Sequence, residues 1–228
     1  MKLSNDTLSI LKNFASINQG IYFKKGKTIR TVSTGKNIMA EAVVNEEIPT
    51  EFGVYDLNNL LSVISLHKEE PTFDFEDNNI LISGLKGRSK IRYRFCAASM
   101  IVTPPDKTIE MPNPEISLKL SGEDLDWVLR AANVLSSPFI AVESNGKKIF
   151  VKTFDSTNDA AHTDSIEIAD GNGDTYCMIF KTENLKVISG GYSIKISSKG
   201  IANFKHETAN IQYWIATEKG STFEKAKK

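Results

Sequence analysis

The chain contains little cysteine and little histidine. Its two cysteines, Cys96 and Cys177, are too few for a disulfide framework, and both lie in apolar stretches, so we expect two buried, reduced thiols. The histidines, His67, His162 and His206, are scattered and lack the ligand spacing of a zinc site. The sequence therefore predicts neither a metal site nor a cofactor.

Catalytic motifs are also missing. The sequence has no G-x-S-x-G nucleophile elbow and no G-x-x-x-x-G-K-[ST] phosphate loop. The run DGNGD at 170–174 lacks the alternating ligands and terminal glutamate of a calcium loop, and we expect it to form a turn. We predict no catalytic residues and a protein that is not an enzyme.

No charge of one sign dominates, and the first segment has no long apolar run. The 28 basic and 28 acidic residues cancel, so any attraction to nucleic acid depends on how the charges are distributed. Asp6 and Lys12 interrupt the apolar positions of the first 18 residues, which argues against a signal peptide or a membrane span there. We expect a soluble intracellular protein without a membrane partner.

Proline is sparse but concentrated. Four of the seven prolines lie in the segment TPPDKTIEMPNPE, near the midpoint of the chain. Proline lacks the N–H group that helices and sheets use, so this segment is predicted to be an extended connector. The sequence thus predicts two domains, residues 1–102 and 116–228, joined by a proline-rich connector at 103–115.

A short repeat indicates that the two halves are duplicates. The string L-x-V-I-S occurs at 61–65 and again at 185–189. Around it, each half reads as a helix, several strands, a short helix and three further strands. The first helix has Ser4 or Asn5 as its N-cap. We predict an α+β protein of two duplicated domains, each with two helices packed on antiparallel sheets, with helices at 4–17, 55–67, 121–136 and 182–190.

The predicted helices have polar, weakly basic exposed faces. Lys12 lies in a stripe of short polar residues on the first helix, and Arg130 lies between Asp126 and Asn133 on the third. Such faces are typical of solvated helices. They are also suited to following a phosphate backbone without reading its sequence.

Three segments carry a resemblance to a known family. The opening MKLSNDTLSILKNFASIN, the segment YDLNNLLSVIS and the helix EDLDWVLRAANVL resemble the sliding clamps of T-even-like bacteriophages, which are related in fold to proliferating cell nuclear antigen. The order of elements is similar along essentially the whole chain. The resemblance implies the DNA clamp fold: a homotrimeric ring of six similar domains that encircles double-stranded DNA and tethers the replicative DNA polymerase, conferring processivity without catalysis.

The resemblance also implies partners, a location and site residues. The partners would be the phage DNA polymerase, the clamp loader ATPase complex and late-transcription factors, in the cytoplasm of the infected bacterial host. By resemblance, the residues facing the DNA are Lys12, Arg130 and Lys186, with Lys2, Lys68 and Lys181 near helix ends. Partner peptides would dock at Ile109 and Met111 in the connector and at Phe223 in the tail.

One strand of the first half has a strongly basic face. In GRSKIRYRF the basic residues alternate with other residues, which puts Arg88, Lys90, Arg92 and Arg94 on one side of a strand. Four like charges repel unless opposite charges compensate them. A solvated outer face is one interpretation. The resemblance to sliding clamps implies another, because in that architecture this strand meets a middle strand of the next subunit's second domain. We therefore favour a head-to-tail subunit interface with the acidic residues of the second half, namely Asp155, Asp159, Asp164, Glu167 and Asp170.

Two other classes of protein fit parts of the sequence. A duplicated, β-rich structural or assembly protein of a virus particle could also be neutral, but it has no need of weakly basic helix faces. A single-strand DNA-binding protein needs stacking aromatics in a basic groove. Trp127 and Trp214 lie in apolar patterns that predict core positions instead.

Overall fold

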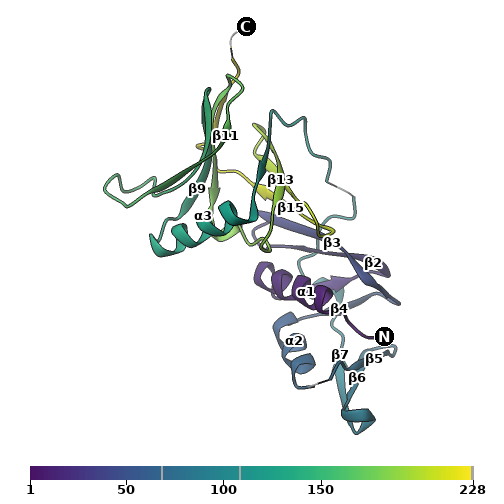
Figure 1. The fold of residues 1–228 in the computed structure, drawn as a ribbon. Helices are drawn as coiled ribbons and strands as arrows, with labels where there is room; N and C mark the ends of the chain where they lie inside the picture. Colours follow the sequence, from purple (N-terminus) through teal and green to yellow (C-terminus); the bar gives the residue numbers. More distant parts are fainter. Residues whose placement is uncertain (68, 108, 227–228) are drawn as a thin grey trace. The chain divides into compact units, whose positions relative to one another are not determined.

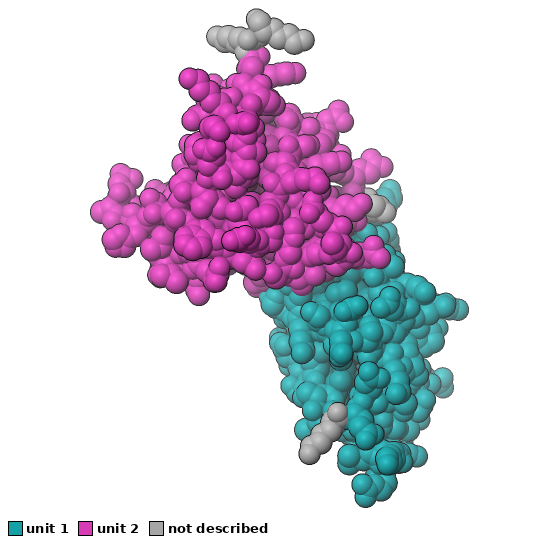
Figure 2. All heavy atoms as spheres, in the orientation of Figure 1, with its two compact units in different colours: residues 1–107 teal, residues 108–228 magenta. Residues whose placement is uncertain are grey.

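The computed structural model describes residues 1–67, 69–107 and 109–226. Lys68, which was predicted to face DNA, lies outside the described residues. The chain divides into two compact units, residues 1–107 and 108–228 (Figure 2). Each unit combines α-helix with antiparallel sheets (Figure 1), which confirms the predicted α+β class.

Two helices lie side by side in unit 1 (Figure 1). Helix α1, Asn5–Ile17, begins at Ser4, whose hydroxyl accepts a hydrogen bond from the Thr7 N–H at 3.3 Å. Helix α2, Leu57–Ser65, is capped in the same way by Asp56. The apolar side chains that the two helices bury are Ile10, Leu11, Phe14, Ala15, Ile17, Leu57, Leu60 and Ile64.

Three groups of antiparallel strands form the rest of unit 1. They are β1 (Ile21–Phe23) with β4 (Phe52–Val54), β2 (Gly26–Val32) with β3 (Ile38–Ile48), and β5 (Thr72–Phe75), β6 (Asn79–Gly84) and β7 (Ser89–Arg94) in that order. Short 3-10 helices cover Leu85–Gly87 and Ala98–Met100. Phe52 stacks on Phe23 at 4.6 Å and on Phe95 at 4.8 Å between ring centroids, which anchors the small sheets in one core.

Unit 2 has one α-helix among the described residues, α3 at Gly122–Val134. Ser121 caps it by accepting from the Asp124 N–H at 3.1 Å, and α3 packs on β9, β10 and β11. One sheet runs in the order β11 (Asp164–Asp170), β10 (Lys148–Phe154), β9 (Phe139–Asn145), β12 (Thr175–Lys181) and β16 (Thr222–Glu224). The other strands pair in the order β8 (Ile116–Leu120), β13 (Tyr192–Ser197), β14 (Ile201–His206) and β15 (Ile211–Ala216).

The predicted second helix of unit 2 is not formed, so the expectation of two helices in each domain is wrong for the second. Only a single 3-10 turn, Thr182–Asn184, is present, and Leu185 leaves helical geometry at φ −85° and ψ 50°. The following N–H groups have other partners: the Ile188 N–H donates to the Tyr213 hydroxyl at 3.2 Å. Gly190, at φ +140°, then turns the chain into β13.

His206 holds this irregular segment in place. Its Nε2 lies 3.2 Å from the Ser189 carbonyl, while Nδ1 accepts from the N–H groups of Thr208 and Ala209 at 3.1 and 2.9 Å. A Cβ at position 190 would lie only 2.2 Å from His206 Nε2. Only glycine combines this close approach with a positive φ.

Candidate nucleic-acid and subunit interfaces

Helix α1 presents the polar face that the sequence predicts. Its apolar face is buried against β2, β3 and α2, and Ser9, Lys12 and Ser16 are exposed on the other side. Lys12 is the only cation of the helix and forms no ion pair with any other residue that the structure describes. The result is a weakly cationic surface without competing carboxylate contacts at Lys12.

Helix α3 and the segment after it bring two more predicted residues into one region of unit 2. Arg130 is exposed, and its Nε donates to the Asp126 carbonyl at 3.1 Å. The Asp126 carboxylate accepts from the Ser189 hydroxyl at 2.8 Å, which ties α3 to the irregular segment that carries exposed Lys186. Because the predicted second helix is not formed, Lys186 lies on an irregular segment that is hydrogen-bonded to α3.

The weaker candidates near helix ends are partly neutralised. Lys2 pairs with Glu70 at 3.6 Å, and Lys181 lies 3.9 Å from Glu183. Both pairs are largely exposed, so they contribute little to stability. They nevertheless reduce the positive potential that these lysines offer to a phosphate.

The basic face of β7 is real but shorter than predicted. Lys90, Arg92 and Arg94 are exposed and alternate with half-buried residues. Arg88 does not belong to this alternation: it precedes the strand with helical backbone angles, and its Nε donates to the Leu85 carbonyl at 3.4 Å. The alternation fails there because a 3-10 turn at Leu85–Gly87 ends just before it. Within the described chain, none of these four cations forms an ion pair.

The acidic strand β11 already has partners inside its own unit. Lys148 Nζ lies 2.7 Å from Glu167 Oε1 and 2.9 Å from Asp170 Oδ1. The hydrogen bond to Glu167, followed by that to Asp170, raises the pKa of Lys148. Two further predicted acids, Asp155 and Asp159, lie in the loop between β10 and β11, and there Asp155 accepts from both the N–H and the hydroxyl of Thr157.

The prediction that Trp127 is a core residue is wrong. Its side chain is 52% exposed on α3, and its indole N–H donates to Asp164 on β11 at 3.0 Å. Val134, seven residues further along the same helix, is 81% exposed. Trp214 is buried as expected. The i, i+7 spacing of Trp127 and Val134 is the signal in the sequence that could have identified this apolar stripe.

The predicted docking residues are less exposed than isolated surface residues would be. Ile109 and Met111 are half-buried, and the described parts of 103–115 form neither helix nor strand. Phe223 lies in β16 and stacks on Tyr176, with ring centroids 6.3 Å apart.

The chemistry of the remaining groups is undistinguished. Cys96 and Cys177 are half-buried free thiols whose pKa values are raised by burial. In residues 1–67, 69–107 and 109–226 there is no cluster of three or more His, Cys, Asp or Glu side chains suited to a metal ion. No helix within these ranges has the length and apolar character needed to cross a membrane.

One sheet in each unit is sealed along one edge. The Met1 amino group donates to the Phe73 carbonyl at 2.9 Å and the Phe73 N–H donates back to Met1, which covers β5. Strand β16 pairs with β12, and the Ile179 N–H beyond it donates to Ser221 Oγ at 3.0 Å. No described strand pairs with the outer side of β7 or of β11. The described strands β7, which is basic, and β11, which is acidic, are therefore two open edges; β2 and β8 likewise have no described strand on their outer sides.

Comparison with known proteins decides the family. Residues 4–103 match the family described as DNA polymerase processivity factor, and residues 117–219 match the family described as gp45 sliding clamp, C terminal. The chain belongs to the sliding-clamp family. This clamp is 33% identical to the sliding clamp of Escherichia phage RB69 over 228 residues, covering 97% of this chain and 99% of the relative. It is 34% identical to that of Enterobacteria phage T4 over 230 residues, with the same coverage.

Solved structures place the clamp in the same fold. Proliferating cell nuclear antigen from Thermococcus kodakaraensis matches with a TM-score of 0.69 at 12% identity, covering 96% of this chain and 99% of that one. The structure of the C-terminal region of FEN-1 bound to A. fulgidus PCNA matches with a TM-score of 0.68 at 16% identity, covering 94% and 96%. These similarities, together with the antiparallel sheets and helices described above, confirm the predicted DNA clamp fold.

Proposed function

We propose that three copies of this clamp close head to tail into a ring around double-stranded DNA. The ring tethers the replicative DNA polymerase and catalyses no reaction of its own. The observation that carries this proposal is the pair of open edges, basic on β7 and acidic on β11, in a chain of the sliding-clamp family.

An open strand edge presents unpaired N–H and C=O groups to its surroundings. Pairing β7 of one copy with β11 of the next would satisfy both rows of groups. It would also bring Lys90, Arg92 and Arg94 near Asp164 and Glu167. Such a contact joins two different surfaces, and it forms a closed ring when the rotation between copies closes. The number of three copies per ring rests on the family resemblance.

DNA binding in this proposal is weak and independent of sequence. Lys12, Arg130 and Lys186 are few and separated by short polar side chains. Charges of this kind attract phosphates through counterion release without distinguishing bases. The ring can then move along the duplex while its closure prevents dissociation.

The partners follow from the same proposal. They are the phage DNA polymerase, the clamp loader ATPase complex and late-transcription factors, in the cytoplasm of the infected bacterial host. The structural neighbour with the C-terminal region of FEN-1 supports the idea that a clamp of this fold can bind a segment of a partner. Ile109, Met111 and Phe223 remain our candidates for such docking.

The alternative, a structural protein of a virus particle, is not favoured, because the matches of both halves of this chain to clamp families would then have to be coincidental.

Light scattering across a dilution series, at low and at high salt, tests the proposed ring. We expect a mass of about 76 kDa, three times the chain mass of 25.3 kDa, and retention on circular but not on open linear DNA. A mass of 25.3 kDa at every concentration would overturn it.

A further inference from the structure

A pocket of about 460 Å³ lies entirely within unit 1, between β1, β2 and the first residues after the second 3-10 helix. Three cations, Lys24, Lys25 and Arg30, contribute to its lining. Ala98, Pro104 and Pro105 supply apolar surface. The pocket therefore combines positive charge with a small apolar wall.

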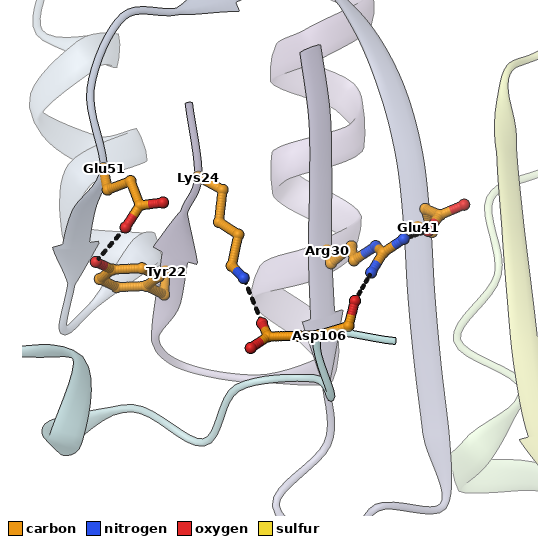
Figure 3. Close-up of polar contacts among 6 residues, drawn as sticks. All are labelled: Tyr22, Lys24, Arg30, Glu41, Glu51 and Asp106. Atoms are coloured by element: carbon orange, nitrogen blue, oxygen red, sulfur yellow. Dashed lines mark hydrogen bonds and ion pairs between the residues drawn. The ribbon is translucent and has the colours of Figure 1, made fainter. Parts of the chain in front are cut away.

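The chain's own Asp106 occupies the positive side of this pocket (Figure 3). Its carboxylate forms an ion pair with Lys24 Nζ, and its carbonyl accepts from Arg30 at 3.4 Å. The side chain of Asp106 is 83% exposed. Hydrogen bonding to Lys24 lowers the pKa of Asp106, so its carboxylate stays ionised at neutral pH.

The cations of the pocket are not all compensated. Arg30 also pairs with Glu41 at 2.5 Å, and Glu51 accepts from the Tyr22 hydroxyl at 3.2 Å (Figure 3). Lys25 is exposed and has no carboxylate partner in the described part of the chain. Among the described residues that line the pocket, one cation, Lys25, has no carboxylate partner while Asp106 is in place, and Lys24 would be a second after Asp106 leaves.

We propose that this pocket binds a carboxylate-bearing segment of a partner protein, an acidic residue next to an apolar one, and that Asp106 leaves Lys24 when the segment binds. The inference rests on the proposed function, since it gives the clamp a second, polar docking site in addition to Ile109 and Met111. Asp106 shows the position that the incoming carboxylate takes.

Exchanging Asp106 for the incoming carboxylate costs little free energy. Exposed ion pairs add little to stability, and replacing one carboxylate by another conserves the charge-assisted hydrogen bond to Lys24. The incoming segment gains what Asp106 lacks, namely apolar contact with Ala98, Pro104 and Pro105 and a second cation in Lys25. Binding would free the connector at Asp106, so the same event could signal occupancy along the chain.

Methyl-resolved NMR of the full-length protein, labelled at alanine and threonine, tests this directly because Ala98, Thr28 and Thr103 line the pocket. The probe is the blocked dipeptide acetyl-Leu-Asp-amide, and its matched control is acetyl-Leu-Asn-amide. We expect saturable shifts of these three methyl signals with the aspartate probe and at least threefold weaker binding of the asparagine probe.

Two variants test the competition. Asp106→Asn should tighten binding of the aspartate probe about threefold or more, and Lys24→Gln should weaken it by a similar factor. Asp77→Asn and Lys27→Gln make the same charge changes outside the pocket and should behave like the unmodified chain. Equal binding of both probes, equal shifts with inorganic phosphate, or no tightening in Asp106→Asn would overturn the inference. These titrations contain neither DNA nor polymerase, so their failure would leave ring formation and DNA retention, which are measured separately, untouched.

Discussion

The indole N–H of Trp127 donates to Asp164 Oδ2 at 3.0 Å, and this bond joins the exposed side of α3 to the open strand β11. Because the indole side chain of Trp127 remains 52% exposed, it is available to a neighbouring copy that pairs with β11. The contact therefore combines an apolar surface with an acidic one at the proposed subunit boundary.

Replacing Trp127 by phenylalanine should weaken self-association while leaving the fold intact. The variant loses the N–H donor and part of the apolar area, and half-buried tryptophans at interfaces commonly account for about 1–2 kcal/mol of binding. We expect the concentration at which the assembly dissociates to rise about tenfold, measured by light scattering on dilution. Val43→Thr, an exposed apolar position in unit 1, is the control. Unchanged dissociation would remove Trp127 from the interface.

Lys148 should oppose assembly, because it neutralises Glu167 and Asp170 within its own unit. Lys148→Met frees both carboxylates for the cations of β7 on the next copy. We expect self-association at low salt to tighten about threefold and the gain to disappear at high salt, as screening predicts. The adjacent exposed Lys147→Met makes the same charge change without this ion pair. A tightening of equal size in Lys147→Met would show a general charge effect instead.

The double variant Lys12→Gln, Arg130→Gln should reduce retention on DNA without changing the mass of the assembly. Each phosphate contact contributes close to one unit to the slope of log affinity against log salt. We expect a shallower slope by about one unit per cation that contacts a phosphate, measured by DNA retention at several salt concentrations. Lys219→Gln removes an exposed charge elsewhere and should have little effect. Retention equal to that of the parent would mean that these helix faces do not face DNA.

Glu46 should make stability depend on pH. Burial raises its pKa, but hydrogen bonds from the Thr7 hydroxyl and from Ser4 outweigh that effect and hold the pKa below its usual value. Its folded pKa is below its unfolded pKa, so its contribution is complete above the unfolded value of about 4.3 and is lost as pH falls through the folded value.

Glu46→Gln should therefore lower the stability of the protein by about 1 kcal/mol at pH 7, as expected for a lost charge-assisted hydrogen bond at a helix start. The difference from the parent should shrink towards zero in acid below the folded pKa. Thermal unfolding at fixed protein concentration measures the stability difference both at pH 7 and in acid. Glu47→Gln, at the exposed neighbouring position, should show neither effect, and a constant difference across pH would contradict the role of the carboxylate.

Gly190→Ala should be strongly destabilising. The new Cβ would lie 2.2 Å from His206 Nε2 at a residue whose φ is +140°, so both a clash and backbone strain result. We expect a loss of about 3 kcal/mol or more. Gly200→Ala also has a positive φ, but nothing lies within 4 Å of its Cβ, so it should cost only about 1 kcal/mol. Similar losses of stability in the two variants would show that the His206 side chain moves aside at little cost.

Much of the fold could be predicted from local patterns in the sequence. Ser4, Asp56 and Ser121 precede apolar residues at helical spacing, and each begins a helix as capping predicts. The second L-x-V-I-S string does not form the predicted helix, because a repeat preserves residues but not their tertiary partners. Tyr213 and His206, later in the chain, bind the backbone groups of Ile188 and Ser189 that a helix would have used. Tertiary contacts of this kind leave no local signal.

The site was predictable only in part. Period-two alternation located the exposed cations of β7 but extended one residue too far, to Arg88, because a 3-10 turn has no clear signature in the letters GLKGR. The same alternation could not show that Lys148 already binds the acids of β11, since that pairing depends on the register of β10. Whether these strands meet a neighbouring copy stays a prediction.

The sealed edges also determine how the protein could misassemble. Met1 covers the outer side of β5 and residues 218–224 cover that of β12, so neither strand adds an open edge to the basic one on β7 and the acidic one on β11. A copy shortened before Thr222 would expose β12 as a further open edge, which lacks the acidic residues that we propose attract β7. Contacts through that edge need not close into a ring, and repeated addition would then give open fibres in place of the closed ring that we propose for the intact protein.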